Sequence, residues 1–243
     1  MSKVTKIQED TEQVFDQHAH QYREVHNESL SKVGFDSYYI SEQKVRVLKQ
    51  VKLVQESTRI NKILDIGCGD GGMAIYFRKH FPNASYYGID ISEESIKIAN
   101  DRQLENCDFR HSSGEKIPFD DHTFDLVMIA GVVMHVPKES HADFLKEANR
   151  ILAKDGIMAI FEHNPYNPVT RRIVKLCPFD QRVVLSSPSY LKNILANFGQ
   201  KNTETRFSLF FPNISIFKYM LPFEKQLYFV PLGGQYCLAM KKV

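Results

Sequence analysis

A glycine-rich segment directly behind a short apolar strand constrains this chain more than any other feature. The segment reads Asp65-Ile-Gly-Cys-Gly-Asp-Gly-Gly72, and the residues before it, Lys62–Ile66, have the pattern of a short buried β-strand. The residues after it, 73–81, place apolar side chains four apart on one helical face. Glycine allows the sharp turn and lets the backbone approach a ligand, because it has no Cβ. Strand, loop and helix together predict a cradle for a nucleotide-sized ligand.

Two ligand fingerprints fit the same glycines. Gly67-x-Gly69-x-x-Gly72 matches the G-x-G-x-x-G pattern of dinucleotide-binding proteins, which predicts NAD or FAD. Asp65-x-Gly67-x-Gly69-x-Gly71 matches D-x-G-x-G-x-G, and in this the segment resembles the class I S-adenosylmethionine-dependent methyltransferases. The carboxylate of Asp65 suits the cationic amino group of that cofactor and suits a pyrophosphate poorly. The methyltransferase interpretation is therefore favoured, and an NAD-dependent oxidoreductase is the alternative.

A second predicted strand also ends in an acidic residue. It covers residues 84–90, and its last residue, Asp90, lies about 25 positions after Asp65, near the spacing expected for a ribose-binding carboxylate. The two oxygens of one carboxylate can accept hydrogen bonds from both ribose hydroxyls. Ser92 then caps a helix whose first turn is acidic, which the helix dipole favours. Asp90 is thus predicted to bind the ribose.

The third and fourth strands extend the resemblance. Ser113-Gly-Glu-Lys-Ile-Pro-Phe119, followed by Phe124-Asp-Leu-Val and then by His135, resembles the ordered motifs of the small-molecule, type 11-like branch of class I methyltransferases. In that family the loop after the third strand contacts the adenine, although Ser113 stands where the family often has Asp. The resemblance covers roughly residues 60 to 163. It implies S-adenosyl-L-methionine as the cofactor, with contacts at Tyr22, Asp65, Gly67, Cys68, Gly69, Gly71, Asp90, Ile91, Ser113, Gly114, Glu115, Ala130 and Gly131.

The resemblance also implies the architecture. It predicts an α/β fold with a Rossmann-like, seven-stranded sheet, preceded by a helical lid and ended by an antiparallel β-hairpin. We expect the lid over residues 1–58, the cofactor-binding core over 59–163, and an acceptor-side loop, helix and hairpin over 164–243 that complete the same domain. The alternating strands and helices of the central region predict a parallel sheet by themselves.

Local patterns predict the elements of the second half in more detail. The apolar face of residues 144–152 predicts a helix that Asp155-Gly156 closes, with the fifth strand at 157–161. Four prolines between Pro165 and Pro188 predict a long loop, and a helix over 190–198 follows. The apolar insertion 211–232 is expected to pack beneath the hairpin; an acceptor pocket, a dimer contact or a membrane contact are the alternatives.

Composition narrows the possible partners. The charge is nearly balanced, with 31 basic and 29 acidic residues, so no nucleic-acid partner is expected. The longest apolar run is about nine residues, which predicts no stable membrane insertion. No signal-peptide pattern, C-x-x-C pair or familiar metal-ligand spacing occurs, so a cytoplasmic protein without a metal is expected. The chain is expected to be a monomer or a homodimer.

Candidate acceptor-side residues follow the fourth and fifth strands. His135 comes after the fourth, and Glu162 and His163 come after the fifth, at carboxyl ends where ligands bind in open α/β sheets. A neutral histidine with the usual pKa of about 6.5 can accept a proton from a hydroxyl or an ammonium group. For His135 a structural role is about equally compatible with the sequence.

These residues predict methyl transfer to O or N of a small or medium-sized acceptor. The segment Glu162-His-Asn-Pro165 is similar to one in bacterial methyltransferases of glycan or secondary-metabolite pathways. A non-catalytic module that binds S-adenosylmethionine is the alternative from another functional class. An RNA methyltransferase is disfavoured, because the chain has no Asn/Asp-Pro-Pro-Tyr-type motif and no separate basic domain.

Overall fold

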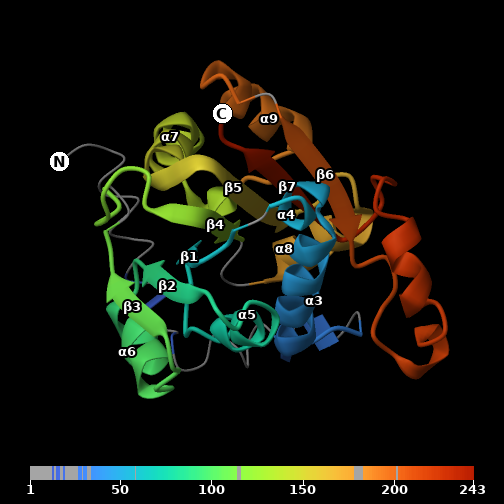
Figure 1. The fold of residues 1–243 in the computed structure, drawn as a ribbon. Coiled ribbons are helices and arrows are strands. Elements are labelled where there is room, and N and C mark those ends of the chain that lie inside the picture. Colours follow the sequence, from blue (N-terminus) through green and yellow to red (C-terminus); the bar gives the residue numbers. More distant parts are fainter. Residues whose placement is uncertain are drawn as a thin grey trace.

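The computed structural model contains one seven-stranded mixed sheet with helices on both faces (Figure 1). It describes residues 13, 15, 16, 19, 27, 28, 30, 31, 34–57, 59–113, 116–177, 183–200 and 202–243. The strands are β1 (Lys62–Ile66), β2 (Ser85–Asp90), β3 (Cys107–His111), β4 (Phe124–Ala130), β5 (Leu152–His163), β6 (Thr203–Ser208) and β7 (Gln235–Lys241). Their order is β3-β2-β1-β4-β5-β7-β6. The first five strands pair in parallel and β7 runs antiparallel to both its neighbours, so the expected fold class is confirmed.

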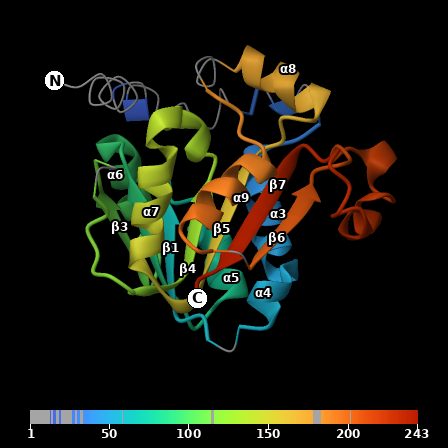
Figure 2. The ribbon, with the colours of Figure 1, turned by 90° about the horizontal axis from the view of Figure 1, so that it is seen from above.

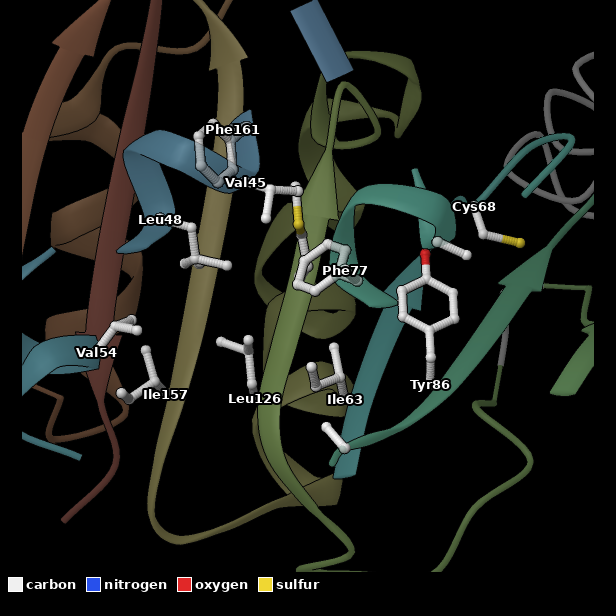
Figure 3. Close-up of a cluster of buried hydrophobic side chains, with 14 of the residues drawn as sticks. Val45, Leu48, Val54, Ile63, Cys68, Phe77, Tyr86, Leu126, Ile157 and Phe161 are labelled. Atoms are coloured by element: carbon white, nitrogen blue, oxygen red, sulfur yellow. The ribbon is translucent and has the colours of Figure 1, made fainter. Parts of the chain in front are cut away.

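Two sets of helices bury the two faces of the sheet. The set on one face comprises α3 (Ser37–Gln50), α4 (Lys52–Gln55), α5 (Ala74–His80) and α6 (Glu93–Asp101). The set on the other face comprises α7 (His141–Ile151) and α9 (Pro188–Asn197). Figure 3 shows the first core, in which Val45 and Leu48 of α3 and Phe77 of α5 pack onto strand residues such as Leu126. Because both faces are covered, the central strands are apolar throughout rather than alternating.

The boundary between α7 and β5 differs from the sequence expectation. The helix ends at Ile151 rather than at Asp155-Gly156, and β5 begins at Leu152. Leu152 pairs with Phe124 of β4, and its carbonyl accepts a hydrogen bond from the Lys242 ammonium at 2.6 Å. Pairing with distant strands therefore recruits residues whose local pattern is helical.

The proline-bearing segment is not a continuous loop. It contains α8 (Pro168–Leu176), whose first residue is a proline. The side chain of Asn167 caps this helix by accepting a hydrogen bond from Thr170 N at 2.9 Å. Proline suits the first position of a helix, because the N–H that it lacks has no partner there. The same geometry begins α9 at Pro188, with Ser187 as its cap, two residues before the expected start.

The apolar insertion 211–232 is also placed differently from the expectation. It lies outside the sheet beside β6, and many of its apolar side chains face solvent, with Tyr219 at 85% exposure (Figure 1). The register fixes its position: Ser208 of β6 and His163 of β5 both pair with Gln235, so the connection leaves and rejoins the sheet at the edge where β5 ends. None of the helices in the described ranges combines the length and the apolar character that a bilayer span requires.

Candidate functional site

The candidate site lies at the carboxyl ends of β1, β2 and β4, where the strand order reverses. The chain runs from β1 outward to β2 and β3 and then returns to β4 on the other side of β1. Connections on opposite sides of such a point leave a crevice at the carboxyl edge, which is where open α/β sheets bind ligands. Figure 2 shows this edge, with α8 beyond the ends of the strands.

The glycine loop lines the crevice with bare backbone. Gly67, Gly69 and Gly71 all have positive φ, at 76°, 53° and 70°. A Cβ on Gly67 would come within 2.2 Å of Val132 Cγ2, so this glycine permits close packing of the two loops. Gly69, and Gly131 after β4, instead face open space: a Cβ on either would have no neighbour within 4 Å in the described structure. These two glycines therefore provide the room that a ligand needs.

Asp90 joins the ends of β1 and β2 through both carboxylate oxygens. Its Oδ2 accepts a hydrogen bond from Gly69 N at 2.8 Å, and its Oδ1 accepts one from Ser92 N at 2.9 Å. Burial raises the pKa of Asp90, and the N–H donors oppose that rise. A carboxylate has about four acceptor positions, so two remain for the hydroxyls of a ribose.

Asp65 is enclosed completely by the protein. Its Oδ2 accepts a hydrogen bond from the Tyr86 hydroxyl at 2.5 Å, and its Oδ1 has no hydrogen-bond partner in the described structure. Burial raises the pKa of Asp65 to about 7, although Tyr86 and Lys44 of α3 both act to lower it. The residue thus places a partial negative charge behind the glycine loop rather than an exposed group in the crevice.

The remaining residues expected to contact the cofactor lie in different surroundings. The Cys68 thiol is buried and lies 2.8 Å from where a Cβ on Gly88 would be, so it fills space between β1 and β2. The Ile91 carbonyl oxygen lies 3.1 Å from His111 Nε2. Ser113 is exposed just after β3. Ala130 ends β4. Tyr22, Gly114 and Glu115 lie outside the described residues.

Glu162 organises the turn that follows β4. Its side chain is 2% exposed, and its Oε1 accepts a hydrogen bond from Val133 N at 2.9 Å, in the short 3-10 turn η1 (Val133–His135). The other oxygen, Oε2, has no partner among the described residues. Burial raises the pKa of Glu162 to about 8. Glu162 therefore fixes the turn that carries His135, whereas His163 is partly exposed at the end of β5.

His135 differs from the expected ordinary histidine. Burial lowers its pKa to about 4, so the imidazole is neutral throughout the physiological range but is a weak base. The Phe15 ring meets it edge-on, with ring centroids 5.3 Å apart. Hydrophobic enclosure depends on residues far apart in the chain, which is why the sequence could not predict this pKa.

Two further residues of the site were missed by the sequence analysis. His141 is fully buried at the start of α7; its Nε2 lies 2.9 Å from the Val136 carbonyl and its Nδ1 lies 3.1 Å from the Tyr190 hydroxyl, which fixes the chain just after η1. Asp16 accepts a hydrogen bond from the Ser92 hydroxyl at 2.6 Å at the start of α6. No sequence pattern marks either contact, because both join segments that are distant or structurally irregular.

The chemistry of the crevice fits the expected cofactor. The space beside Gly69 and Gly131 has room for a ligand, the Asp90 carboxylate can accept further hydrogen bonds, and a positively charged ligand would favour ionisation of the enclosed Asp65 and Glu162. Among the described residues, no cluster of three or more His, Cys, Asp or Glu side chains has the arrangement of a metal site.

Comparisons with known proteins agree with this geometry. Residues 63–156 match the model of a methyltransferase domain family. The demethylmenaquinone methyltransferase of Chlorobaculum parvum is 28% identical over 211 residues, which cover 86% of this chain and 78% of that protein. The phthiotriol/phenolphthiotriol dimycocerosates methyltransferase of Mycobacterium leprae is 33% identical over 121 residues, covering 46% of this chain and 43% of that protein.

Solved structures show the same fold at lower identity. A methyltransferase of Thermotoga maritima, described as a possible histamine N-methyltransferase, superposes with a TM-score of 0.67 at 18% identity and covers 95% of this chain and 99% of its own. A methyltransferase of Archaeoglobus fulgidus superposes with a TM-score of 0.64 at 19% identity, and the match covers 85% of this chain and 95% of that protein. The shared fold and the match to a methyltransferase domain family confirm the resemblance and the S-adenosylmethionine cofactor, and they favour that cofactor over NAD.

The raised pKa of Glu162 predicts a pH-dependent effect of Glu162→Gln on stability. The glutamine oxygen can still accept from Val133 N, but the side chain carries no charge. In the wild type, burial favours the protonated acid, so its contribution to stability is complete below about pH 4.5 and is lost as the pH rises through about 8. The melting temperature of the variant should therefore rise relative to wild type between pH 5 and pH 8.

Glu139→Gln on the exposed turn before α7 is the matched control for this measurement. Its melting-temperature difference from wild type gives the baseline over the same pH range. If the Glu162→Gln difference changes no more than this baseline, Glu162 is not a buried acid with a raised pKa.

Proposed function

This chain is a class I S-adenosylmethionine-dependent methyltransferase, and we propose that it methylates an oxygen or nitrogen atom of a small or medium-sized acceptor. The observation that carries the proposal is the convergence at one edge: His135 follows the open Gly131 by four positions, and Glu162 fixes the turn between them. Phe15 covers His135 from the other side. A reaction site covered in this way suits a small acceptor better than a macromolecule.

We propose the cofactor roles residue by residue. The loop from Gly67 to Gly71 receives the amino-acid end, with the Asp65 charge behind it, and Asp90 binds the ribose hydroxyls. Ser113 and the adjoining backbone meet the adenine. The full set is the one that the family resemblance implies. The support for these roles is the open space at Gly69, the spare acceptor capacity of Asp90 and the enclosed negative charge at Asp65.

On the acceptor side, we propose that alignment supplies most of the catalysis. The bound cofactor supplies an electrophilic methyl group on a sulfonium. Holding a nucleophile in line can supply roughly 7–11 kcal/mol of the barrier. The neutral imidazole of His135 accepts the acceptor's proton or a hydrogen bond from it, with Glu162 as the residue that positions the turn and His163 beside the opening. A base with so low a pKa contributes less than one near neutrality.

The support for an apolar acceptor comes from the relatives rather than from the site. Two of them are named for methylating demethylmenaquinone and phthiotriol or phenolphthiotriol dimycocerosates. We propose an acceptor with an apolar body, in place of the glycan suggested by the Glu-His-Asn-Pro segment. The nearly balanced charge supports a small-molecule acceptor over nucleic acid, and we propose that the chain acts in the cytoplasm as a monomer or homodimer.

We propose that, of the expected lid 1–58, the part before α3 covers the crevice, whereas α3 and α4 pack on one face of the sheet and 164–243 complete the same domain. Two contacts support the lid. Asp16 bonds to Ser92 beside the ribose carboxylate, and Phe15 contacts His135 on the acceptor side. One short stretch thus spans the crevice from the end of β2 to the turn after β4. Closure of such a segment would exclude water from the transferring methyl group.

Gly69→Ala should block the cofactor while the fold survives. Its Cβ would enter open space, so the folding cost is the positive φ alone, about 1–2 kcal/mol. We expect calorimetric titration with S-adenosylhomocysteine to show at least about tenfold weaker binding, because the alanine side chain would occupy space that the cofactor needs. Gly199→Ala carries the same strain in open space after α9 and should bind normally. Equal affinity of the two variants would place the cofactor elsewhere.

His135→Asn should lower turnover while S-adenosylhomocysteine affinity is retained. Transfer of labelled methyl groups to fractionated metabolite extracts would identify the acceptor. Because the pKa of His135 is about 4, kcat/KM should show no acidic limb from this residue between about pH 5.5 and 7.5. His80→Asn, at the distant end of α5, is the control. Turnover within about threefold of wild type would show that positioning alone drives the reaction.

The lid predicts ligand-dependent protection from trypsin. S-adenosylhomocysteine should slow cleavage within residues 1–45, because the bound cofactor would hold the segment closed. Asp16→Ala, which removes the bond to Ser92, should reduce that protection. Cleavage that is indifferent to the ligand in both proteins would mean that the segment is ordinary packing.

A further inference from the structure

Two segments carry most of the exposed large apolar side chains of this protein. They are the α8 segment, defined as residues 164–177, and the insertion, defined as residues 211–232. Of fifteen such side chains in the described residues, eleven lie here. They are Tyr166, Val169, Leu176, Ile214, Ile216, Tyr219, Met220, Phe223, Tyr228, Phe229 and Leu232. Scattered apolar residues need no explanation, but a concentration of this kind marks an interaction surface.

Hydrogen bonds join the two segments side by side. The Asn164 amide donates to the carbonyls of Pro231 and Gly233 at 3.1 and 2.7 Å, and the Asn167 amide donates to the Leu232 carbonyl at 2.7 Å. Both segments begin at the carboxyl edge of the sheet, beyond the end of β5 (Figure 2). The start of the α8 segment and the end of the insertion therefore lie against each other, and we treat the two segments as one surface.

The insertion is held through its polar groups and turns its apolar groups outward. Glu224 Oε1 accepts hydrogen bonds from Phe210 N and Phe211 N at 2.7 and 2.9 Å. Tyr228 O accepts from Phe207 N at 2.7 Å, so the backbone of the insertion bonds to β6. Meanwhile Ile216 is 75% exposed and Tyr219 is 85% exposed. This is the reverse of the usual arrangement, in which apolar groups are inside.

This surface carries an excess of positive charge. The two segments contain Arg171, Arg172, Lys175, Lys218 and Lys225, all exposed, and one acid, Glu224, whose carboxylate is partly buried in the bonds just described. The whole chain has a net charge of only +2, so the remainder is net acidic. Within the part of the chain that the structure describes, these five cations form no ion pair.

We propose that this surface docks onto an anionic lipid bilayer. Exposed aromatic and aliphatic side chains enter the headgroup region, and the surrounding cations pair with lipid phosphates. The charge pattern disfavours a second copy of the chain, because a two-fold contact would place the same cations opposite each other. Docking in this way brings the end of β5, which lies at the same edge of the sheet as the candidate site, to the membrane surface.

Sedimentation of the full chain with vesicles tests the proposal. The protein should bind vesicles of phosphatidylcholine mixed with phosphatidylglycerol, bind pure phosphatidylcholine weakly, and be released by high salt. Each basic residue near an anionic surface contributes roughly fivefold to the partition coefficient. Arg171→Gln, Arg172→Gln and Lys175→Gln together should therefore lower it about a hundredfold.

An apolar variant and a control distinguish docking through this surface from nonspecific hydrophobic adsorption to the vesicles. Ile216→Ser, Tyr219→Ser and Phe223→Ser together should lower binding at least about tenfold, since burial of these side chains is lost. Tyr38→Ser with Ile75→Ser, exposed apolar residues outside the two segments, should bind like wild type. If the triple variants fail to fold, Lys218→Gln with Lys225→Gln should still lower binding about twentyfold.

Three results would overturn the proposal. The first is absence of wild-type binding to anionic vesicles at low salt. The second is binding that the surface variants leave unchanged. The third is a wild-type dimer that the apolar variant converts to a monomer, which would make this surface a contact between copies. S-adenosylhomocysteine affinity, measured in parallel, reports on the cofactor site independently of lipid binding.

Discussion

The bonds of the Asp90 carboxylate to Gly69 N and Ser92 N hold the candidate site together. The first bond acts together with those that Gly67 N and Cys68 N donate to the Ile89 carbonyl in fixing the glycine loop, and the second lies at the start of α6. The Ser92 hydroxyl in turn donates to Asp16. One carboxylate thus links the loop to the start of α6 and keeps acceptor capacity for a ligand.

The electrostatics of the site follow from two enclosed acids. Asp65 lies behind the glycine loop and Glu162 lies beneath the turn after β4, and burial raises both pKa values. Lys44 of α3 acts to lower both, so the charged forms depend on a nearby cation. A positively charged ligand in the crevice would favour ionisation further. The two enclosed acids would therefore complement a cationic ligand through burial and charge.

Short-range patterns in the sequence predicted the central strands, the glycine turn after β1 and the Ser92 cap of α6, because a strand, its turn and a helix cap are local. The predictions that were wrong concern features that contacts between distant residues determine. Lys242 and Phe124 bind Leu152 and draw it into β5, and Asn167 converts a proline-rich stretch into α8. The bond from Val133 to Glu162 crosses 29 residues, and the low pKa of His135 comes from enclosure. None of these leaves a periodic signal.

The insertion shows why apolar composition alone does not predict burial. A core needs a second layer, and β6 is the last strand of the sheet, so the chain beyond it has no further element to pack against. The polar contacts of Glu224 and Asn164 hold the insertion in place without burying its aromatic residues. Exposed apolar area costs about 25 cal/mol per Å², and folding does not remove that cost here. Contact with an external surface would remove it. The apolar residues that do not join the core of this protein are thus the ones available for an interaction.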